Sequence, residues 1–333
     1  MTDLSPDHLT VGTTSPFLPG TNIQFAWDST SLGYLKTCPR LYQYIMIEGW
    51  GSTAESIHLR FGIEYHSALQ NYDIIRAEGV PHEDAVHRVV RDLLVSSADW
   101  SPDRESRAGK YKNRDTLLSL VVDYLDHFVD DPAQTHIMSN GKPAVELSFR
   151  FELDFGPEYG DAIGNGPEQG TQPYLLSGHL DRVVEFNDHL FVMDHKTTTT
   201  TPGQYYFHQY EPNNQMTLYT LGGQVVLNSP IKGVIISAAQ ILLDKENRFV
   251  RGFTYRTQDQ IEEWLNDLRI LLQTNESYAD ANYWPMNDTA CDKFGGCRFR
   301  EVCSKTPEAR EMFLKTDFTK LEEAERWNPL RSR

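Results

Sequence analysis

The stretch from Tyr174 to Thr200 constrains the fold of this chain more than any other part of it. It reads as three short strands in a meander, over Leu175–His179, Arg182–Phe186 and His189–His195. The pair Asn187-Asp188 suits the turn between the last two strands, because both side chains tolerate positive φ and hydrogen-bond their own backbone. The sequence therefore predicts a meander of three strands.

Charged residues stand at the ends of these predicted strands, where apolar residues would otherwise be expected. Asp181 begins the second strand, and Asp194 and Lys196 lie two residues apart near the end of the third, so they point to one face. Carboxylate oxygens suit Mg²⁺ or Mn²⁺, and a lysine beside them can orient or deprotonate an attacking water. The alternative is that Asp181 opens a turn, Asp194 ends a strand and Lys196 is solvated.

A second pair of polar residues follows downstream. Gln215 and Tyr219 lie four residues apart on a segment whose apolar residues have helical periodicity. Residues at this spacing share one face of a helix. A helix that follows the charged strand can place this face over the charged residues.

These pieces occur in an order that resembles the PD-(D/E)XK nuclease superfamily. They are Gly178-His179-Leu180-Asp181, Asp194-His195-Lys196 and Gln215-x-x-x-Tyr219. The likeness is closest to the RecB-like exonuclease branch, which includes CRISPR-associated RecB-like exonucleases and phage-encoded relatives. That branch also has a histidine on a helix after a glycine and a glutamate on the strand before the meander, and His66 and Glu146 match them. The resemblance runs from about residue 29 to residue 303.

The resemblance implies a three-layer α/β/α, restriction-endonuclease-like core with a mixed sheet. It also implies a metal-dependent DNA exonuclease that acts on single-stranded ends in recombination, repair or DNA processing. One or two Mg²⁺ or Mn²⁺ ions would be held by His66, Asp181, Asp194 and the backbone carbonyl of His195. Lys196 would position or activate the water, Gln215 and Tyr219 would hold Lys196, water or the scissile phosphate, and Glu146 would support the ligands or join them.

The chain has four cysteines, Cys38, Cys291, Cys297 and Cys303. The last three are separated by gaps of five residues, and Gly295 and Gly296 allow the backbone between them to fold tightly. In an intracellular protein such a set is better explained by a metal site than by disulfides. Tetrahedral zinc and an iron–sulfur cluster are both compatible with four thiolates.

The resemblance favours the cluster. Nucleases of the RecB-like branch carry a [4Fe–4S] cluster that joins one N-terminal cysteine to three C-terminal ones. The Cys-Pro-Arg-x-Tyr sequence at Cys38 and the final Cys-x₅-Cys match that pattern. The first C-terminal gap is five residues here, whereas the family often has two, so zinc is kept as the alternative.

The net charge of −16 does not give the chain the basic surface usual for nucleic-acid enzymes. A local cleft can nevertheless be positive on an acidic protein. The densest basic window is a candidate for contacts with DNA phosphates, and a solvated surface loop is the alternative. It contains Arg104, Arg107, Lys110, Lys112 and Arg114.

The chain has 333 residues and no apolar run long enough to span a membrane, and its first residues do not resemble a secretory signal. We therefore expect a cytoplasmic protein. The sequence predicts a poorly ordered N-terminus over 1–24, a helical region with Cys38 and His66 over 25–142, a nuclease core over 143–280, a cysteine region over 281–305 and a helical tail over 306–333.

Two other classes of function compete with the exonuclease. The chain could be a non-catalytic subunit that binds DNA ends in a CRISPR-adaptation or recombination complex, although the full set of site residues argues against a decayed site. It could also be a structure-specific endonuclease. The sequence has no helicase P-loop. It leaves open whether the protein forms a homo-oligomer or acts with a recombination or CRISPR-type protein partner.

Overall fold

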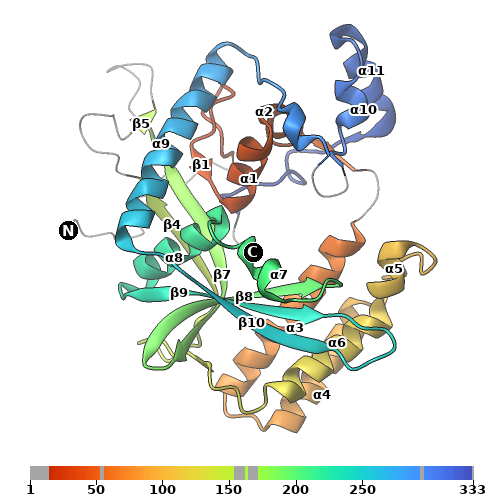
Figure 1. The fold of residues 1–333 in the computed structure, drawn as a ribbon, viewed down its shortest axis with the longest axis vertical. Coiled ribbons are helices and arrows are strands. Elements are labelled where there is room, and N and C mark those ends of the chain that lie inside the picture. Colours follow the sequence, from red (N-terminus) through yellow and green to blue (C-terminus); the bar gives the residue numbers. More distant parts are fainter. Residues whose placement is uncertain (1–14, 53–55, 154–161, 164–171, 293–295, 332–333) are drawn as a thin grey trace. The chain divides into compact units, whose positions relative to one another are not determined.

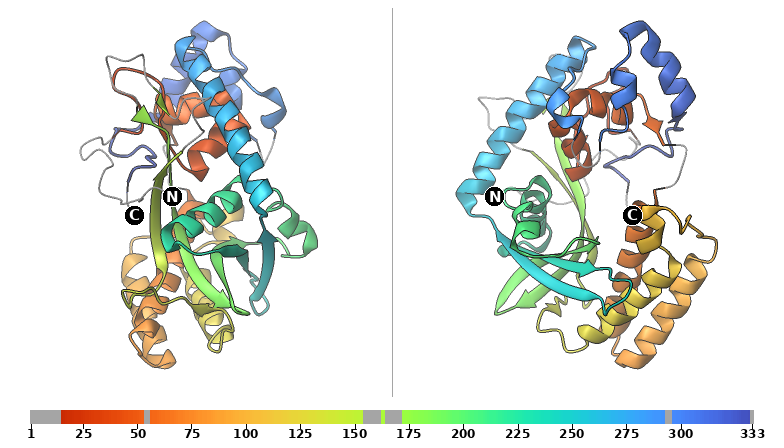
Figure 2. Two further views of the ribbon diagram at one scale, coloured as in Figure 1. Left: turned by 90° about the vertical axis from the view of Figure 1, so that its left-hand side faces the viewer. Right: turned by 45° about the vertical axis from the view of Figure 1, so that its right-hand side comes forward.

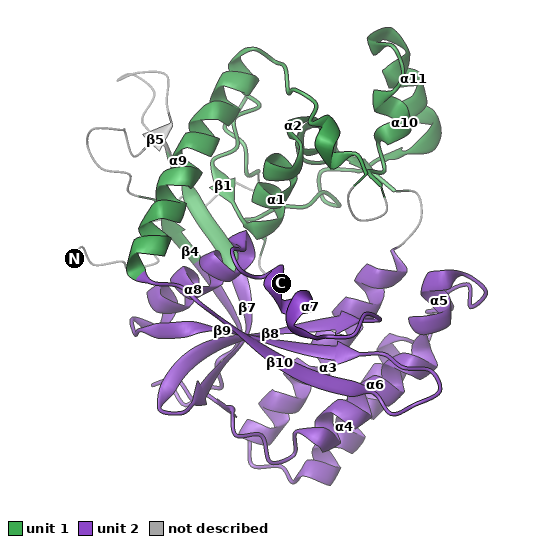
Figure 3. Cartoon of the chain, in the orientation of Figure 1, with its two compact units in different colours: residues 1–54, 150–178, 258–333 green, residues 55–149, 179–257 purple. Residues whose placement is uncertain are grey.

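The computed structural model describes residues 15–52, 56–153, 162–163, 172–292 and 296–331 (Figure 1). The chain divides into two compact units, each assembled from segments that are distant in the sequence (Figure 3). Residues 1–54, 150–178 and 258–333 form one unit, here called the cysteine unit. Residues 55–149 and 179–257 form the other, here called the sheet unit. The division differs from the linear segments predicted above, because two long strands each contribute residues to both units.

The sheet is mixed, as predicted. Its strands follow the order β1-β7-β8-β9-β10, and β3 and β4 also pair with β7. β8 and β9 are parallel, whereas β7 with β8 and β9 with β10 are antiparallel. The strands are β1 (Ala26–Trp27), β3 (Gln134–Thr135), β4 (Val145–Glu152), β7 (Leu175–Phe186), β8 (His189–Thr198), β9 (Ile231–Gln240) and β10 (Arg248–Tyr255).

Helices of the sheet unit cover both faces of its strands. Gly223 lies so close to β8 that an added Cβ would come within 3.1 Å of Val192, whereas Tyr124 contacts His195 and Ser237. Val192 and His195 point to opposite faces because strand side chains alternate. The predicted three-layer arrangement is therefore confirmed, and Figure 2 shows the orange and yellow helices gathered beside the sheet. The helices are α3 (Ile57–Ala77), α4 (His82–Ser96), α5 (Arg107–Tyr111), α6 (Arg114–His127), α7 (Gln204–His208) and α8 (Asn214–Leu227).

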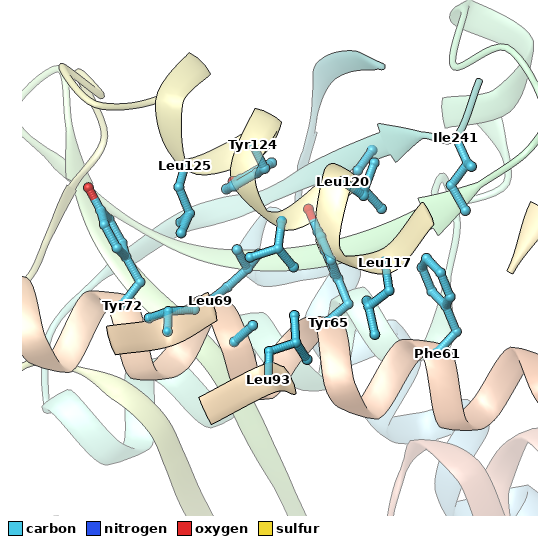
Figure 4. Close-up of a cluster of buried hydrophobic side chains, with 14 of the residues drawn as sticks. Phe61, Tyr65, Leu69, Tyr72, Leu93, Leu117, Leu120, Tyr124, Leu125 and Ile241 are labelled. Carbon is cyan, nitrogen blue, oxygen red and sulfur yellow. The ribbon is translucent and has the colours of Figure 1, made fainter. Parts of the chain in front are cut away.

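A buried apolar cluster fixes the helices on the His195 face. Side chains three or four residues apart on α3 meet those of α4 and α6, as Figure 4 shows. Burial of each large apolar side chain stabilises the fold by about 1.5–3 kcal/mol. Because buried Tyr65 and Leu69 belong to this cluster, α3 is held in place on both sides of His66. The fully buried members include Phe61, Tyr65, Leu117, Leu120 and Val121.

The predicted meander is confirmed in part. Asn187 and Asp188 form the expected turn with φ of 50° and 62°, and β7 and β8 pair on either side of it. The first two predicted strands, however, are one continuous strand, β7. The chain stays extended through Gly178–Asp181 because β4 lies alongside, where Ser148 Oγ is 2.8 Å from His179 Nδ1.

The cysteine unit is mainly helical. Asp28 caps its first helix by accepting a hydrogen bond from the backbone of Ser31, as the polar residues there predicted. A small core of Tyr44, Trp50 and Phe299 with two further residues holds its parts together. Its elements are α1 (Ser29–Thr37), α2 (Pro39–Tyr42), the π-helix η2 (Gln43–Ile47), β2 (Trp50–Gly51), β5 (Ala162–Ile163), β6 (Gln172–Pro173), α9 (Gln258–Asp280), η3 (Asp288–Ala290), α10 (Arg300–Cys303), α11 (Pro307–Asp317) and β11 (Thr319–Lys320).

Both ends of the chain differ in detail from the predicted segments. The N-terminal segment 1–24 lies partly outside the described residues, and its described part forms a turn closed by a bridge between Phe17 and Gln24. The tail predicted to be helical over 306–333 is helical only in α11, because Thr319 and Lys320 then pair with β2. Within the described ranges, no helix is long and apolar enough to cross a membrane.

Candidate active site

The predicted site residues gather in the sheet unit where β7 and β8 separate. The ladder between the two strands runs from Phe186 and His189 to Arg182 and Met193, whereas β8 stays paired with β9 up to Thr198. Asp181 and Asp194 are the next residues beyond that last pair. The end of the ladder therefore places both carboxylates at the same point of the sheet.

Asp181 replaces the missing backbone partner at this point. Its Oδ2 accepts a hydrogen bond of 3.0 Å from the backbone N–H of His195. The same oxygen lies 3.1 Å from Nδ1 of His66, which comes from α3. Burial alone would lower the pKa of His66, but the adjacent carboxylate outweighs it and the pKa is raised. Burial raises and His66 lowers the pKa of Asp181, and the net shift is downward, so this carboxyl is ionised.

Asp194 and Lys196 form a close ion pair on the face that α8 covers. Lys196 Nζ lies 3.0 Å from Oδ1 and 2.8 Å from Oδ2 of Asp194. Burial raises the pKa of Asp194 despite the lysine. Burial would lower the pKa of Lys196, but Asp194 and Asp181 outweigh it and raise the pKa, so the ammonium stays protonated.

Gln215 and Tyr219 extend this pair into a chain of contacts. Lys196 Nζ donates to Gln215 Oε1 at 3.2 Å, and Gln215 Nε2 donates to the Tyr219 hydroxyl at 3.0 Å. The side chain of Asn213 caps α8 by accepting hydrogen bonds from the backbone of Gln215 and Met216, which fixes the first turn of the helix. The two polar residues thus share one helix face, and that face meets the charged strand.

Glu146 and the His195 side chain take different positions. Glu146 has a left-handed φ of 49° near the start of β4. Ala144 accepts a hydrogen bond from Val183, and Ser148 contacts His179, so Glu146 occupies the level of Asp181 in the strand pair. The imidazole of His195 is buried on the opposite face of β8. Burial lowers its pKa, so it is neutral, and its backbone alone contacts Asp181.

Comparison with known protein families identifies this arrangement. The sequence matches the PD-(D/E)XK nuclease superfamily over residues 29–304. The chain belongs to that superfamily. A comparison with curated proteins gave no match. Among solved structures the chain is similar to a proposed exonuclease from Eubacterium rectale, with 10% identity, coverage of 86% of this chain and 92% of the other, and a TM-score of 0.47. It is also similar to a protein named SSO0001, with 13% identity, coverage of 75% and 77%, and a TM-score of 0.30.

Nucleases of this superfamily typically use Mg²⁺ or Mn²⁺. In this PD-(D/E)XK nuclease the candidate ligands are the side chains of Asp181, Asp194 and His66. In the described residues, no group of three or more His, Cys, Asp or Glu side chains is arranged for metal binding. The donors are nevertheless of the right kind, since the buried Asp194 carboxylate, which pairs with Lys196, lies near the ionised Asp181 and interacts with it electrostatically. Two carboxylates and an imidazole suit a small divalent cation.

The basic window of the nuclease does not form one surface. Arg104 is exposed and pairs with an aspartate of α6 at 2.7 Å, and Arg107 and Lys110 are also exposed. Arg114 donates to the carbonyl of Leu94 at 2.7 Å, where α4 ends. Its guanidinium therefore supports the packing of α4, which leaves it less suited to a phosphate.

Lys112 behaves unlike the rest of the window. It is buried, and its Nζ donates to Thr197 Oγ1 at 3.1 Å and lies over the ring of Phe61 at 5.2 Å. Burial lowers the pKa of Lys112 to about 8. Thr197 is the residue after Lys196 on β8, so this lysine reaches the strand that carries the site.

Sequence reasoning missed the aromatic helix α7, which lies between β8 and α8. Tyr206 of this helix interacts electrostatically with Lys196 and Asp194, and burial raises the pKa of its phenol. The signal was present as Tyr205-Tyr206-Phe207 followed by Tyr210, immediately before the Gln215 helix.

The four cysteines come together in the cysteine unit. All of them line one pocket of about 470 Å³ and all are free thiols. The backbone N–H of Asn287 donates to Cys38 Sγ at 3.3 Å, and that of Cys297 donates to the carbonyl of Cys291 at 2.8 Å. Gly296 has a φ of 105°, which only glycine adopts readily. The predicted Gly295 lies outside the described residues.

Proposed function

We propose that this PD-(D/E)XK nuclease is a Mg²⁺- or Mn²⁺-dependent DNA exonuclease of the RecB-like branch that hydrolyses phosphodiester bonds from single-stranded ends. The observation that carries the proposal is the unbroken chain of contacts from Asp194 through Lys196 and Gln215 to Tyr219, beside the Asp181–His66 pair. Such a chain fixes one ammonium group beside two carboxylates. This is the arrangement that phosphodiester hydrolysis needs, because charge develops on the phosphate.

Each residue then has a specific task. Asp181, Asp194, His66 and the carbonyl of His195 would hold the cation. When bound, the cation would stabilise the charge that develops on the phosphate and on the leaving oxygen. Lys196 is protonated, so it acts as a hydrogen-bond donor that positions the attacking water or the scissile phosphate rather than as a base.

The neighbouring residues keep Lys196 in position. Gln215 and Asp194 both accept hydrogen bonds from its ammonium group, which fixes the direction in which that group presents its charge. Tyr219 accepts from Gln215 and so fixes the orientation of the amide. Glu146, at the level of Asp181, supports the same strand junction or adds a carboxylate to it.

The cysteine pocket carries a separate proposal. We infer that Cys38, Cys291, Cys297 and Cys303 bind a [4Fe–4S] cluster with a structural role in the cysteine unit. The location of all four thiols around one pocket supports a ligand held by all of them. Iron and acid-labile sulfide in anaerobically purified protein would support the cluster, and stoichiometric zinc without iron would replace it with a zinc site.

The experiment for the main proposal uses anaerobically purified full-length protein, end-labelled linear single-stranded DNA and Mn²⁺. We expect the wild type to degrade the DNA to short products and Lys196→Ala to leave it intact. Lys232→Ala is the matched control, because this exposed lysine lies on β9 outside the site. Cleavage of circular single strands would make the protein an endonuclease, and retained activity of Lys196→Ala would overturn the assigned site.

Cleavage only after addition of a protein partner would assign the chain to a recombination or CRISPR-type complex. If neither the wild type nor Lys196→Ala cuts while both bind DNA ends, the chain is a binding subunit and the catalytic proposal is wrong. We place its action in the cytoplasm, in DNA recombination, repair or processing.

A further inference from the structure

Helix α7 presents an aromatic side chain that the fold does not use. The helix and the two residues after it, 204–210, contain three tyrosines and one phenylalanine, which are Tyr205, Tyr206, Phe207 and Tyr210. The Tyr205 side chain is 91% exposed, more than any other large apolar side chain among the described residues. Isolated exposed apolar residues are common, so exposure alone decides nothing. The other three aromatic residues matter because they hold the segment that carries Tyr205.

Phe207 anchors α7 to the rest of the sheet unit, and Tyr206 and Tyr210 pack on each other. Phe207 packs on Gly252 of β10 so closely that an added Cβ would lie 2.2 Å from its ring. Tyr206 and Tyr210 bring their hydroxyls to 3.4 Å, and their rings pack edge to face. The helix is thus attached through one aromatic face, and Tyr205 is left on the exposed side.

Backbone contacts hold the end of the same segment. The carbonyl of Tyr210 accepts hydrogen bonds from Arg256 at 2.9 Å and from Thr254 at 3.3 Å. Such anchoring gives a five-residue helix a defined position that its own hydrogen bonds would not provide. Tyr205 is therefore an exposed ring on an ordered backbone, so stacking of a ligand on it does not require a loop to become ordered.

The place of α7 between the strand and the helix of the site puts the Tyr205 ring beside the candidate active site. Lys196 precedes α7 by eight residues and Gln215 follows it after a short turn. Gly252, on which Phe207 packs, pairs with Ile236 of β9, and Ile236 pairs with Asp194 of β8, so α7 lies at the level of Asp194 on the same face of the sheet. A strand whose phosphate lies at Lys196 would therefore carry its neighbouring nucleotides past α7.

We propose that Tyr205 is a stacking platform for an unpaired base of the DNA strand that enters the site. The proposal rests on the proposed nuclease function and makes it more specific. Within a duplex both faces of a base are already stacked, so an exposed ring can take only an unpaired or terminal base. Stacking is independent of sequence and complements an acidic protein, of net charge −16, that has few basic contacts for the backbone.

The test measures binding in EDTA, so that cleavage does not interfere, with fluorescently labelled single-stranded DNA and a blunt duplex. We expect Tyr205→Ala to weaken single-strand binding about 10-fold and duplex binding by less than about 2-fold, as the loss of one stacked base predicts. Tyr205→Phe keeps the ring and should bind like the wild type. Tyr283→Ala, which removes a tyrosine 61% exposed in the cysteine unit, is the control for a general surface effect.

An abasic nucleotide scanned along the single strand gives a readout that a structural role would not change. One position should weaken wild-type binding about 10-fold and have no effect on Tyr205→Ala, while thermal stability stays the same. Equal binding by Tyr205→Ala and wild type, or an equal loss on duplex, would overturn the platform. If the wild type cuts DNA and Tyr205→Ala does not change single-strand binding, this inference alone is refuted. A wild type that neither binds nor cuts DNA refutes the nuclease function as well.

Discussion

The candidate active site and the cysteine pocket are organised in opposite ways. In the site, most of the proposed side chains already contact one another at hydrogen-bond distance, as Asp194, Lys196 and Gln215 do. In the pocket, the thiols line a shared space, and Cys38 Sγ accepts its hydrogen bond of 3.3 Å from the backbone N–H of Asn287 rather than from another side chain of the set. One region is preorganised by its own side chains, whereas the other would obtain its final geometry from what it binds.

The same contrast appears in what stabilises each region. Beneath the site, the sheet unit contains a buried ionic network in which Arg182 lies 3.3 Å from Asp73 and Arg251 contacts both oxygens of Asp131 at 2.6 Å. The ring of Phe128 covers the Arg251 guanidinium at 3.9 Å. Around the cysteine pocket, Arg40 instead donates to the backbone carbonyl of Trp284 at 3.1 Å, and Arg310 to that of Cys303 at 3.3 Å. Perturbing the two regions should therefore affect different properties of the protein.

The largest expected effect is on catalysis. Lys196→Ala removes the ammonium that contacts both Asp194 and Gln215, and we expect a loss of kcat of about 1000-fold, as for removal of a preorganised charge donor. Asp194 is already shifted towards its neutral form, so it takes up a proton and the thermal midpoint should change little. Single-turnover cleavage and calorimetry measure both quantities. If Lys196→Ala unfolds the protein and loses no more activity than the unfolding explains, the site is not preorganised.

The next effect concerns the cysteine pocket. Cys297→Ser should remove the bound metal and lower stability by about 4 kcal/mol, because a ligand group that joins Cys38 to the C-terminal cysteines closes a loop of more than 200 residues. Metal analysis and denaturant unfolding provide the measurement, with Ser304→Ala as a neighbouring control. Equal stability and unchanged metal content in Cys297→Ser would show that the thiols do not act together.

A third effect tests the network beneath the site. Asp131→Asn removes the charge that pairs with Arg251 and leaves a buried guanidinium without its counter-ion, which we expect to destabilise the protein by about 3 kcal/mol. The metal content of the cysteine pocket should stay the same. Urea unfolding with parallel metal analysis measures both. Loss of metal together with stability would show that the two regions are not independent.

The smallest effect has the opposite sign. Lys112→Met replaces a buried lysine whose pKa is lowered to about 8 and should stabilise the protein by about 1–3 kcal/mol at pH 7. The unfolded state keeps the proton up to about pH 10.4 and the folded state loses it above about 8, so wild-type stability rises with pH between these values. Burial, and after it the charge of Lys112, lower the pKa of His58.

Unfolding curves from pH 7 to pH 10 measure this effect. The wild type should gain stability over that range, and Lys112→Met should lack the gain. Single-strand binding should weaken in the variant if Lys112 serves the phosphate backbone beside Thr197. A variant that is less stable at every pH would identify Lys112 as a structural residue.

Local sequence spacing determined most of the candidate site. Asn187 and Asp188 specified the turn, the spacing of Asp194 and Lys196 placed both on one strand face, and the spacing of Gln215 and Tyr219 placed both on one helix face. These features could be predicted because side-chain directions repeat every two residues in a strand and every 3.6 residues in a helix. For residues that are close in the sequence, the relative directions of the side chains therefore follow from the sequence alone.

Tertiary structure decided the rest. The pairing of β4 with β7 kept Gly178–Asp181 extended, and the end of the β7–β8 ladder set where Asp181 meets His195. Packing of α5 and α6 separated Lys112 from Arg114, although only two positions divide them in sequence. Cys38 reached the same pocket as its C-terminal partners across more than 200 residues. No local period encodes such contacts, because they depend on the summed packing of whole elements.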